Sequence, residues 1–331
     1  MSSRAGIRDV ATATGLSITT VSHALSGKGR VSEKTRAIVL AAAQELGYQP
    51  DPIAAGLASG RVGVIGVPVV HLDSRHWGHT YRPYYAAFTG GATMLAVERE
   101  HALVVVPAAP GSGMIRRVPL DGMIVVDPEP NDAILADCLR RGIPVVADGA
   151  PLDPGNGGVP VVHSDAEDAL RALLDRLRAT GSRRVALLTG TEADSYTLDT
   201  GAAYREWCAT TGNPPIVEAL QPDEVPEVAA QRLLSGAARP DAVHGLNETY
   251  GEALLAAARR LGLSIPGDLR VTMMCETSED KHWEVPLTVV SLEAAARGAV
   301  AAGALIDLLA GNEVGRLHVP TRLVFRASTG D

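Results

Sequence analysis

The residues with the clearest chemical pattern lie within Ile7–Leu25, which reads IRDVATATGLSITTVSHAL. Thr19, Ser22 and His23 fall on one face of the helix that this stretch predicts, and Ile18 stands at its N-terminal edge. Hydroxyl and imidazole groups can hydrogen-bond to base edges, and a β-branched side chain can contact the methyl groups of thymine. We therefore interpret this face as one that reads the major groove of DNA.

The residues around this face predict how the helix is positioned. Ala11 is small enough to let a second helix cross closely, and Gly15 suits a turn with a positive φ. Ser17 is a good N-cap for the second helix, and we also expect it to lie at the DNA. An apolar stripe at helical spacing, opposite the DNA-reading face, would be buried: Val21, Ala24, Leu25. This pattern predicts a helix-turn-helix; the alternative is a helical hairpin on a protein surface.

A third helix completes the predicted N-terminal head. The loop Gly27–Arg30 is basic, and Ser32 is the expected N-cap of a helix from Glu33 to Leu46. We include Arg30 and Ser32 among the expected DNA-binding residues, because the loop would lie beside the phosphate backbone. The expected buried stripe of the third helix is Ile38, Ala41, Ala42, Leu46.

Charge is divided unevenly along the 331 residues. Residues 1–61 hold seven basic and four acidic side chains, a net charge of +3, so the other residues carry −11 of an overall −8. A basic head on an acidic body fits a small DNA-binding module attached to a larger ligand-binding one. The three cysteines, Cys138, Cys208 and Cys275, lack metal-ligand spacing and indicate a reducing compartment. No membrane-spanning run or secretory signal is found, so we expect a cytoplasmic protein.

The body alternates short apolar runs with helical patterns, which predicts parallel sheets covered by helices on both faces. The expected strands are Val62–Val69, Leu103–Val106, Gly122–Val126, Pro144–Ala147, Val185–Thr189, Ala242–Leu246, Leu269–Met274 and Val289–Leu292. The expected helices are Tyr84–Arg99, Asp132–Arg141, Ala166–Ala179, Ala203–Thr211, Glu227–Leu234, Glu248–Leu261 and Glu293–Leu309. Ligands bind such folds at the carboxyl ends of the strands.

A second group of chemically active residues follows the first strand of the body, in HLDSRHWGHTYRPYY, residues 71–85. His71, Asp73, Trp77 and Tyr81 are the types that line a pocket for a sugar or another ring, since tryptophan stacks on flat faces. Three histidines also admit a metal site, although their spacing fits no single helix face. The third alternative is a solvated loop.

The chain resembles the LacI/GalR family of bacterial repressors. In the head, the resemblance rests on DVATATGLSITTVSHALSG, VSEKTR, ELGYQPD and AAGLASGR. In the body, it rests on GVIGVPVV, DGMIVV, GIPVVADG, GSRRVALLTG, LNETYGEALLAAARRLGLSIPGDLRV, PLTVVSLE and PTRLVFRAST. It implies an α/β protein with a three-helix helix-turn-helix head and a periplasmic-binding-protein-like body of two doubly wound parallel-sheet subdomains.

The resemblance also implies a domain plan. Residues 1–50 would form the DNA-binding domain, 51–61 a hinge helix or linker, and 62–331 the effector-binding and dimerisation domain. The first subdomain would hold about 62–162 and 292–319, and the second about 163–291 and 320–331. Leu57 occupies the place of the family's leucine that wedges between base pairs. The family most often has arginine where this chain has His23, so we carry over no operator sequence.

The predicted effector site departs from the family's pattern. Asp148 and Asn247 match positions that bind ligand in relatives, but Leu198 stands where many have arginine and Cys275 where many have aspartate. A sugar pocket needs several polar groups to satisfy hydroxyls that leave water. The effector is therefore less polar than usual, or the site no longer responds to a small molecule.

These observations predict a homodimeric regulator that binds a pseudo-palindromic operator in double-stranded DNA. It would repress catabolic or transport genes under control of a small molecule of unknown identity in the inter-subdomain cleft. The alternative is a regulator with a vestigial pocket, ligand-independent or controlled by a protein partner. No serine-nucleophile elbow, Walker loop or dinucleotide fingerprint is found, so we expect neither an enzyme nor a cofactor, and no membrane or metal partner.

Overall fold

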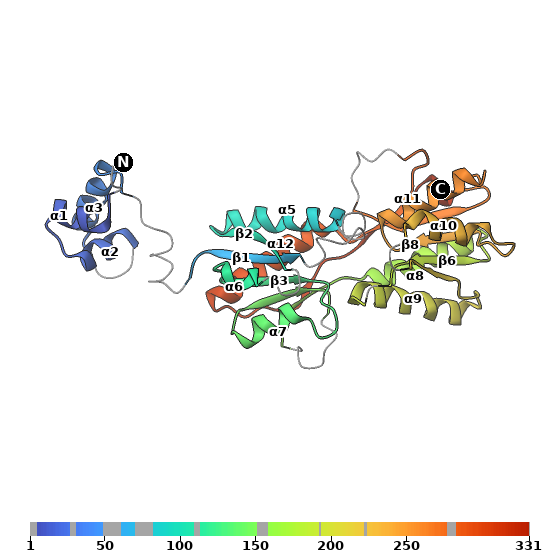
Figure 1. The fold of residues 1–331 in the computed structure, drawn as a ribbon, viewed down its shortest axis with the longest axis horizontal. Coiled ribbons are helices and arrows are strands. Elements are labelled where there is room, and N and C mark those ends of the chain that lie inside the picture. The colour runs from blue at the N-terminus through green and yellow to red at the C-terminus, as the bar shows by residue number, and fades with distance from the viewer. Residues whose placement is uncertain are drawn as a thin grey trace. The chain divides into compact units, whose positions relative to one another are not determined.

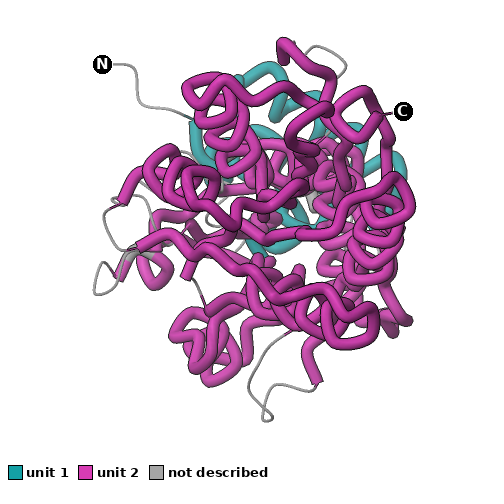
Figure 2. Tube along the Cα trace, turned by 90° about the vertical axis from the view of Figure 1, so that its right-hand side faces the viewer, with its two compact units in different colours: residues 1–62 teal, residues 63–331 magenta. Residues whose placement is uncertain are grey.

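The computed structural model of the chain is shown in Figure 1. It describes residues 5–26, 31–48, 61–69, 82–108, 113–150, 158–191, 193–221, 224–276 and 283–330. The chain forms two compact units, Met1–Val62 and Gly63–Asp331, which Figure 2 colours separately. Each unit is an independent body with its own core.

The N-terminal unit is a three-helix bundle of α1 (Ile7–Thr14), α2 (Ile18–Ser26) and α3 (Glu33–Glu45). Gly15 ends α1 with φ 67°, in the left-handed region that the sequence predicts for it. The core contains Val10 and Ala11 of α1, the α2 residues Val21 and Ala24, and one side of α3. The predicted buried face of α2 is thus confirmed.

The predicted buried stripe of α3 was wrong. Ile38 is 48% exposed and Leu46 is 40% exposed, whereas Val39 and Ala43 are buried. The helix is turned by about one residue from the prediction, and Ala42 alone of the four expected side chains contacts this core. A helix with several apolar side chains on two faces leaves this choice to tertiary packing.

The body contains two six-stranded sheets. The first has the strand order β11-β5-β4-β3-β1-β2. Its strands are β1 (Val64–Val69), β2 (Ala102–Pro107), β3 (Gly122–Val126), β4 (Val145–Asp148), β5 (Val161–His163) and β11 (Leu317–His318). All its pairings are parallel. Helices α5 (Arg82–Glu98), α6 (Met114–Arg117), α7 (Ala133–Arg140) and α12 (Ala294–Ala310) accompany this sheet (Figure 1).

The second sheet has the order β12-β10-β9-β8-β6-β7, and only the β10–β12 pair is antiparallel. Its strands are β6 (Val185–Thr189), β7 (Val217–Ala219), β8 (Ala242–Gly245), β9 (Arg270–Met274), β10 (Thr288–Ser291) and β12 (Arg322–Val324). Helices α8 (Ala166–Ala179), α9 (Ser195–Thr211), α10 (Pro226–Ser235) and α11 (Glu248–Arg260) accompany it. A short 3-10 helix, Ala327–Thr329, lies near the C-terminus.

Most of the predicted elements of the body are present with small shifts of their ends. Helix α9 begins at Ser195, eight positions before the predicted start at Ala203, because the Asp194 carboxylate accepts a hydrogen bond from the Thr197 N–H at 2.8 Å and caps it. The strands β5, β7, β11 and β12 were not predicted. Each has two or three residues, too few to show a periodic pattern.

The chain passes between the two sheets three times, after β5, after β10 and after β11. The passages are tied together by polar contacts. The Asp165 carboxylate accepts hydrogen bonds from the backbone N–H and the hydroxyl of Thr321, at 2.6 and 2.8 Å. Arg322 pairs with Glu293 at 2.9 Å. Each of these contacts joins two of the three crossing segments.

Helices α5 and α12 cross with almost no space between their backbones. A Cβ atom placed on Gly298 would lie 2.0 Å from the Phe88 carbonyl oxygen, and one on Gly91 would lie 1.9 Å from that of Ala295. Only glycine fits at these two positions. The pair covers the first sheet with a core that includes Phe88 and Leu305.

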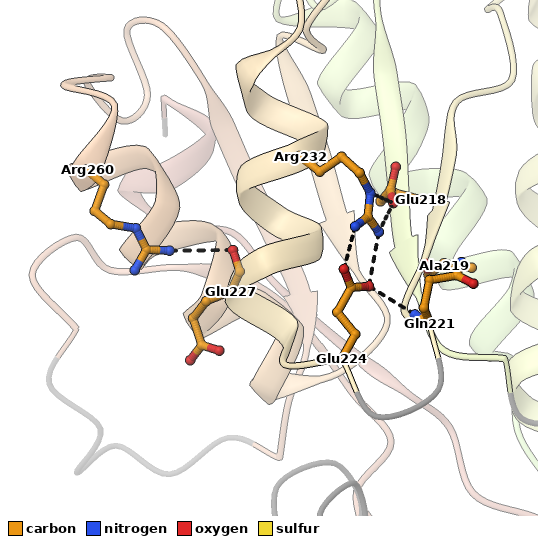
Figure 3. A network of polar contacts seen from close by, with 7 residues as sticks. All are labelled: Glu218, Ala219, Gln221, Glu224, Glu227, Arg232 and Arg260. Carbon is orange, nitrogen blue, oxygen red and sulfur yellow. Dashed lines mark hydrogen bonds and ion pairs between the residues drawn. The ribbon is translucent and has the colours of Figure 1, made fainter.

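Figure 3 shows how helix α10 is fixed to the edge strand β7 of the second sheet. Arg232 of α10 forms ion pairs with Glu218 of β7 and with Glu224. The Glu224 carboxylate also accepts a hydrogen bond from the Gln221 N–H at 3.0 Å. Arg260 of the neighbouring helix α11 donates to the Glu227 carbonyl of α10 at 3.5 Å. These groups are near solvent, so they orient α10 more than they stabilise the fold.

The His244 ring of β8 provides a pH-dependent term in the stability of the body. It is fully buried, its Nδ1 lies 3.0 Å from the Thr272 hydroxyl, and burial lowers its pKa to about 4. In the unfolded chain the ring titrates near its ordinary value of 6.5. Protons therefore bind the unfolded state first, and the stabilisation present above about pH 6.5 is lost as the pH falls towards about 4.

We predict that protonation linked to the His244 ring lowers the free energy of unfolding of the body by about 2 kcal/mol when the pH falls from about 7 to about 5. Denaturant unfolding of wild type and His244→Asn at the two pH values measures it. The variant should lose that share of the pH dependence, while the control His318→Asn, at an exposed residue, should keep it. Equal pH dependence in wild type and His244→Asn would contradict the prediction.

Candidate functional site

The N-terminal unit presents the predicted DNA-reading face of α2 to solvent. Ile18 is 46% exposed, and Thr19 and His23 are exposed, while Ser22 is half-buried. An exposed isoleucine beside polar side chains, opposite a buried core, is the arrangement that a helix in a major groove requires.

The two predicted capping serines begin α2 and α3. The Ser17 hydroxyl accepts a hydrogen bond from the Thr20 N–H at 3.1 Å, and Ser32 accepts one from the Thr35 N–H at the same distance. Both serines are exposed, so each helix N-terminus is open to a phosphate group. Arg30 and Leu57 lie outside the described residues, as does the hinge segment apart from Arg61.

Two adjoining cavities lie between the two sheets of the body, at the carboxyl ends of the strands. The smaller is about 60 Å³ and the larger about 200 Å³. Tyr84, Asp127, Tyr196 and Leu292 line both, which makes them parts of one site. Tyr84 belongs to the first subdomain and Tyr196 to the second, so the site is shared between the two.

Asp127 follows β3 directly and is the acidic centre of this site. Its backbone adopts φ 45°, and its N–H donates to the Asp148 carbonyl at 2.7 Å. Burial raises the pKa of the Asp127 carboxyl well above its usual range, and the charges of Asp194 and Asp148 raise it further, whereas Arg297 lowers it. Within the described ranges, the Asp127 side chain forms no ion pair.

Asp148 ends β4 and is 1% exposed. Its carboxylate accepts hydrogen bonds from the Tyr84 hydroxyl at 2.6 Å and from the Arg297 Nε at 2.8 Å. Arg297 also donates from Nη2 to the Val162 carbonyl at 3.0 Å. The Arg297 Nη1 has no hydrogen-bond partner among the described residues, and Arg297 lines the larger cavity.

The second subdomain contributes the ends of β8 and β9. The Asn247 side chain caps α11 by accepting from the Thr249 N–H at 3.0 Å. Cys275 donates weakly from Sγ to Glu248 at 3.5 Å, and the Glu276 carboxylate accepts from the Ala294 N–H at 2.8 Å. Burial raises the pKa of Glu276. Asn247, Glu248, Cys275 and Glu276 all line the smaller cavity.

The predicted effector residues are distributed differently in the structure. Asn247 and Cys275 line the smaller cavity, whereas Asp148 and Leu198 line neither. Asp148 lies behind Tyr84 and Arg297, which use its oxygens, and Leu198 is 46% exposed on α9. The remaining four predicted residues lie in the undescribed segment 70–81: His71, Asp73, Trp77, Tyr81.

Sequence analysis missed three residues that define the cavities, Tyr84, Asp127 and Arg297. A signal existed for Asp127, since it is the first residue after a predicted strand, where ligand-binding groups gather. Nothing in the sequence distinguishes Arg297 from the exposed arginines of other helices. Its role follows from the approach of α12 to the end of β4.

The described residues also bear on two other features, a metal site and a membrane-spanning helix. No group of three or more histidine, cysteine or carboxylate residues suited to a metal ion occurs among the described residues. Within those residues, no helix is long and apolar enough to cross a bilayer.

Comparison with known proteins agrees with this arrangement. Residues 6–51 match the family described as bacterial regulatory proteins, lacI family, and residues 174–329 match the periplasmic binding protein-like domain. The two matches correspond to the three-helix unit and to most of the second subdomain with its connections.

Two regulatory proteins are similar to this chain, one over nearly its whole length and one over about three fifths of it. The HTH-type transcriptional regulator CelR of Thermobifida fusca is 28% identical over 96% of this chain and 96% of its own. The maltose regulon regulatory protein MalI of Escherichia coli is 33% identical over 62% of this chain and 58% of its own.

Solved structures show the same fold. The lac repressor dimer bound to operator and the anti-inducer ONPF superposes with a TM-score of 0.80 at 22% identity, covering 99% of each chain. A CelR–cellobiose complex gives 0.69 at 26% identity, covering 98% of this chain and 100% of the other.

The helix-turn-helix head, the two-sheet body and these relatives agree on one assignment. The chain belongs to the LacI family of bacterial regulatory proteins, as a DNA-binding transcriptional regulator with a periplasmic-binding-protein-like body.

Proposed function

We propose that this protein is a cytoplasmic, homodimeric repressor of catabolic or transport genes, and that a small molecule in the inter-sheet cavity controls its binding to a pseudo-palindromic operator. The observation that carries the proposal is the solvent-exposed face of α2, with Ile18, Thr19 and His23 opposite the buried Val21. This face does not contribute to the core of the three-helix unit, because other residues form that core.

The head would read one half of the operator. Thr19 and His23 supply hydrogen-bonding groups for base edges, and Ile18 supplies methyl groups for thymine. Ser17 and Ser32 would place the N-termini of α2 and α3 against phosphates. Arg30 would add a phosphate contact, and Leu57 in the hinge would wedge into the minor groove at the operator centre.

A second copy of the chain would pair with the first subdomain along α5 and β2. The outer face of α5 carries apolar side chains, including Met94, 66% exposed, and Val97, 65% exposed. β2 is the edge strand of its sheet, and its Val105 is 47% exposed. An apolar helix face beside an open sheet edge is a surface that a partner covers.

The cavity would couple to the head through the angle between the two subdomains. Both subdomains line it, so a bound ligand favours one angle over others. A coupling of about 1–3 kcal/mol is typical of such regulators. The Arg297 Nη1 has no hydrogen-bond partner among the described residues, which supports a responsive cavity rather than a vestigial one, and the CelR–cellobiose complex supports a sugar-like effector.

The role of His23 in reading bases leads to a test. We predict that His23→Arg changes the preferred base at one symmetric position of the operator, because arginine makes a bidentate contact to guanine that histidine cannot make. Selection of binding sites from a random duplex library by the full-length protein measures the preference.

The control for that selection is Gln44→Arg, which adds the same charge at an exposed position of α3. It should leave the base preference unchanged and alter affinity for all duplexes alike. A His23→Arg selection identical to wild type would show that His23 contacts no base. Failure of the wild type to select any sequence would contradict the function itself.

The proposed pairing surface gives a separate prediction. The double variant Met94→Glu, Val97→Glu would place two charges on the contact and should convert the dimer to monomer, with operator affinity lowered at least about tenfold. Sedimentation and operator titration measure the two effects. Leu139→Glu, at an α7 residue that is 41% exposed, is the matched control and should remain dimeric. A dimeric double variant would place the contact elsewhere.

A further inference from the structure

The strongest unexplained feature of the body is the imbalance of charge around its cavities. Among the described residues, those that line the smaller cavity include the acidic Asp127, Glu248 and Glu276 and no basic one. The larger cavity adds the carboxyl groups of Glu167 and Asp199. The structure thus gathers acidic groups where a ligand would be enclosed.

Among the described residues that line the two cavities, Arg297 is the only arginine, and it does not neutralise the acidic groups. Arg297 is 5% exposed, and its Nε and Nη2 are bound to Asp148, at 2.8 and 2.5 Å. The charge of Arg297 is therefore offset by a carboxylate that does not line the site. Leaving a buried arginine donor without an acceptor is costly, so the Nη1 group indicates a ligand oxygen at this position.

Asp127 differs from the other two carboxylates of the smaller cavity. Glu276 caps α12 through the Ala294 N–H, and Glu248 is contacted by Cys275. Asp127 has no ion pair within the residues described, and it lines both cavities together with Tyr84 and Tyr196. A cation placed against Asp127 would also lie beside these aromatic rings, which favour positive charge.

We propose that the effector is an amino sugar or a similar polyol that carries one ammonium group, with the ammonium held by Asp127 and an oxygen held by the Arg297 Nη1. This inference rests on the proposed effector control and names its ligand class.

The groups that face the Asp127 carboxyl favour this ligand class. Burial and the neighbouring carboxylates raise the pKa of Asp127, which disfavours its charged form. A bound ammonium reverses that shift, so binding should release a proton and strengthen as the pH rises through the pKa of Asp127. The charged and titratable groups around it are Asp148, Asp194, Asp199, Arg297, Tyr84, Tyr85 and Tyr196.

The test uses three pairs of sugars that differ only at C2, as amine or hydroxyl: glucosamine and glucose, galactosamine and galactose, mannosamine and mannose. Thermal shift and calorimetric titration of the full-length protein measure binding. At least one amine should bind about tenfold more tightly than its hydroxyl partner, because a charged hydrogen bond is stronger than a neutral one. Titration in two buffers of different ionisation heat should show proton release for the amine.

Asp127→Asn is the decisive variant. Asparagine tolerates the positive φ of position 127, so the fold should survive, and an unchanged melting temperature without ligand checks this. The variant should bind the preferred amine about tenfold more weakly and lose most of the preference over the hydroxyl partner. Glu129→Gln, at an exposed carboxylate two positions along, lines neither cavity and should behave as wild type.

Three outcomes would overturn the inference: no amine binds, a neutral sugar binds as tightly as its amine partner, or Asp127→Asn keeps the preference. These outcomes are separable from failure of the proposed function. If a neutral sugar binds and changes operator affinity in the same preparation, effector control stands and only the ammonium assignment is lost.

Discussion

The structure of the body depends on one buried ion pair, that of Asp148 and Arg297, at the carboxyl ends of the first sheet. It joins the end of β4 to the first turn of α12, a helix that begins directly after the chain returns from the second subdomain. Breaking a buried pair costs about 3–5 kcal/mol, because one charge is left unpaired. The pair also directs Tyr84 into the cavity, since the Tyr84 hydroxyl donates to the same carboxylate.

This constraint explains why the ligand cavity differs from what the family resemblance implies. Asp148 is present at the expected position, but Arg297 and Tyr84 occupy its oxygens, so it positions other groups rather than facing the cavity. Asp127, which directly follows the neighbouring strand β3, lines both cavities instead. The cavities lie at the same end of the sheet, but the aspartate that lines them follows β3, whereas Asp148 ends β4.

The three-helix unit and the body differ in how they present their functional side chains. The three-helix unit has a small aliphatic core and keeps its functional side chains exposed, so its surface can meet DNA with little rearrangement. The body encloses its functional groups between two subdomains joined by three chain crossings. In the proposed function, a ligand held between the two subdomains acts on the angle between them.

The sequence alone determined the elements with strong periodicity or caps. Leu170, Leu173, Leu174 and Leu177 recur at helical spacing and form the buried face of α8, and Gly15 and Ser17 define the turn between α1 and α2. Only the tertiary structure decided which side of α3 is buried, where the short strands β5, β7, β11 and β12 pair, and that Arg297 meets Asp148. These features depend on residues that are far apart in the chain. Arg297 and Asp148 are 149 positions apart, and a local sequence pattern cannot predict such a contact.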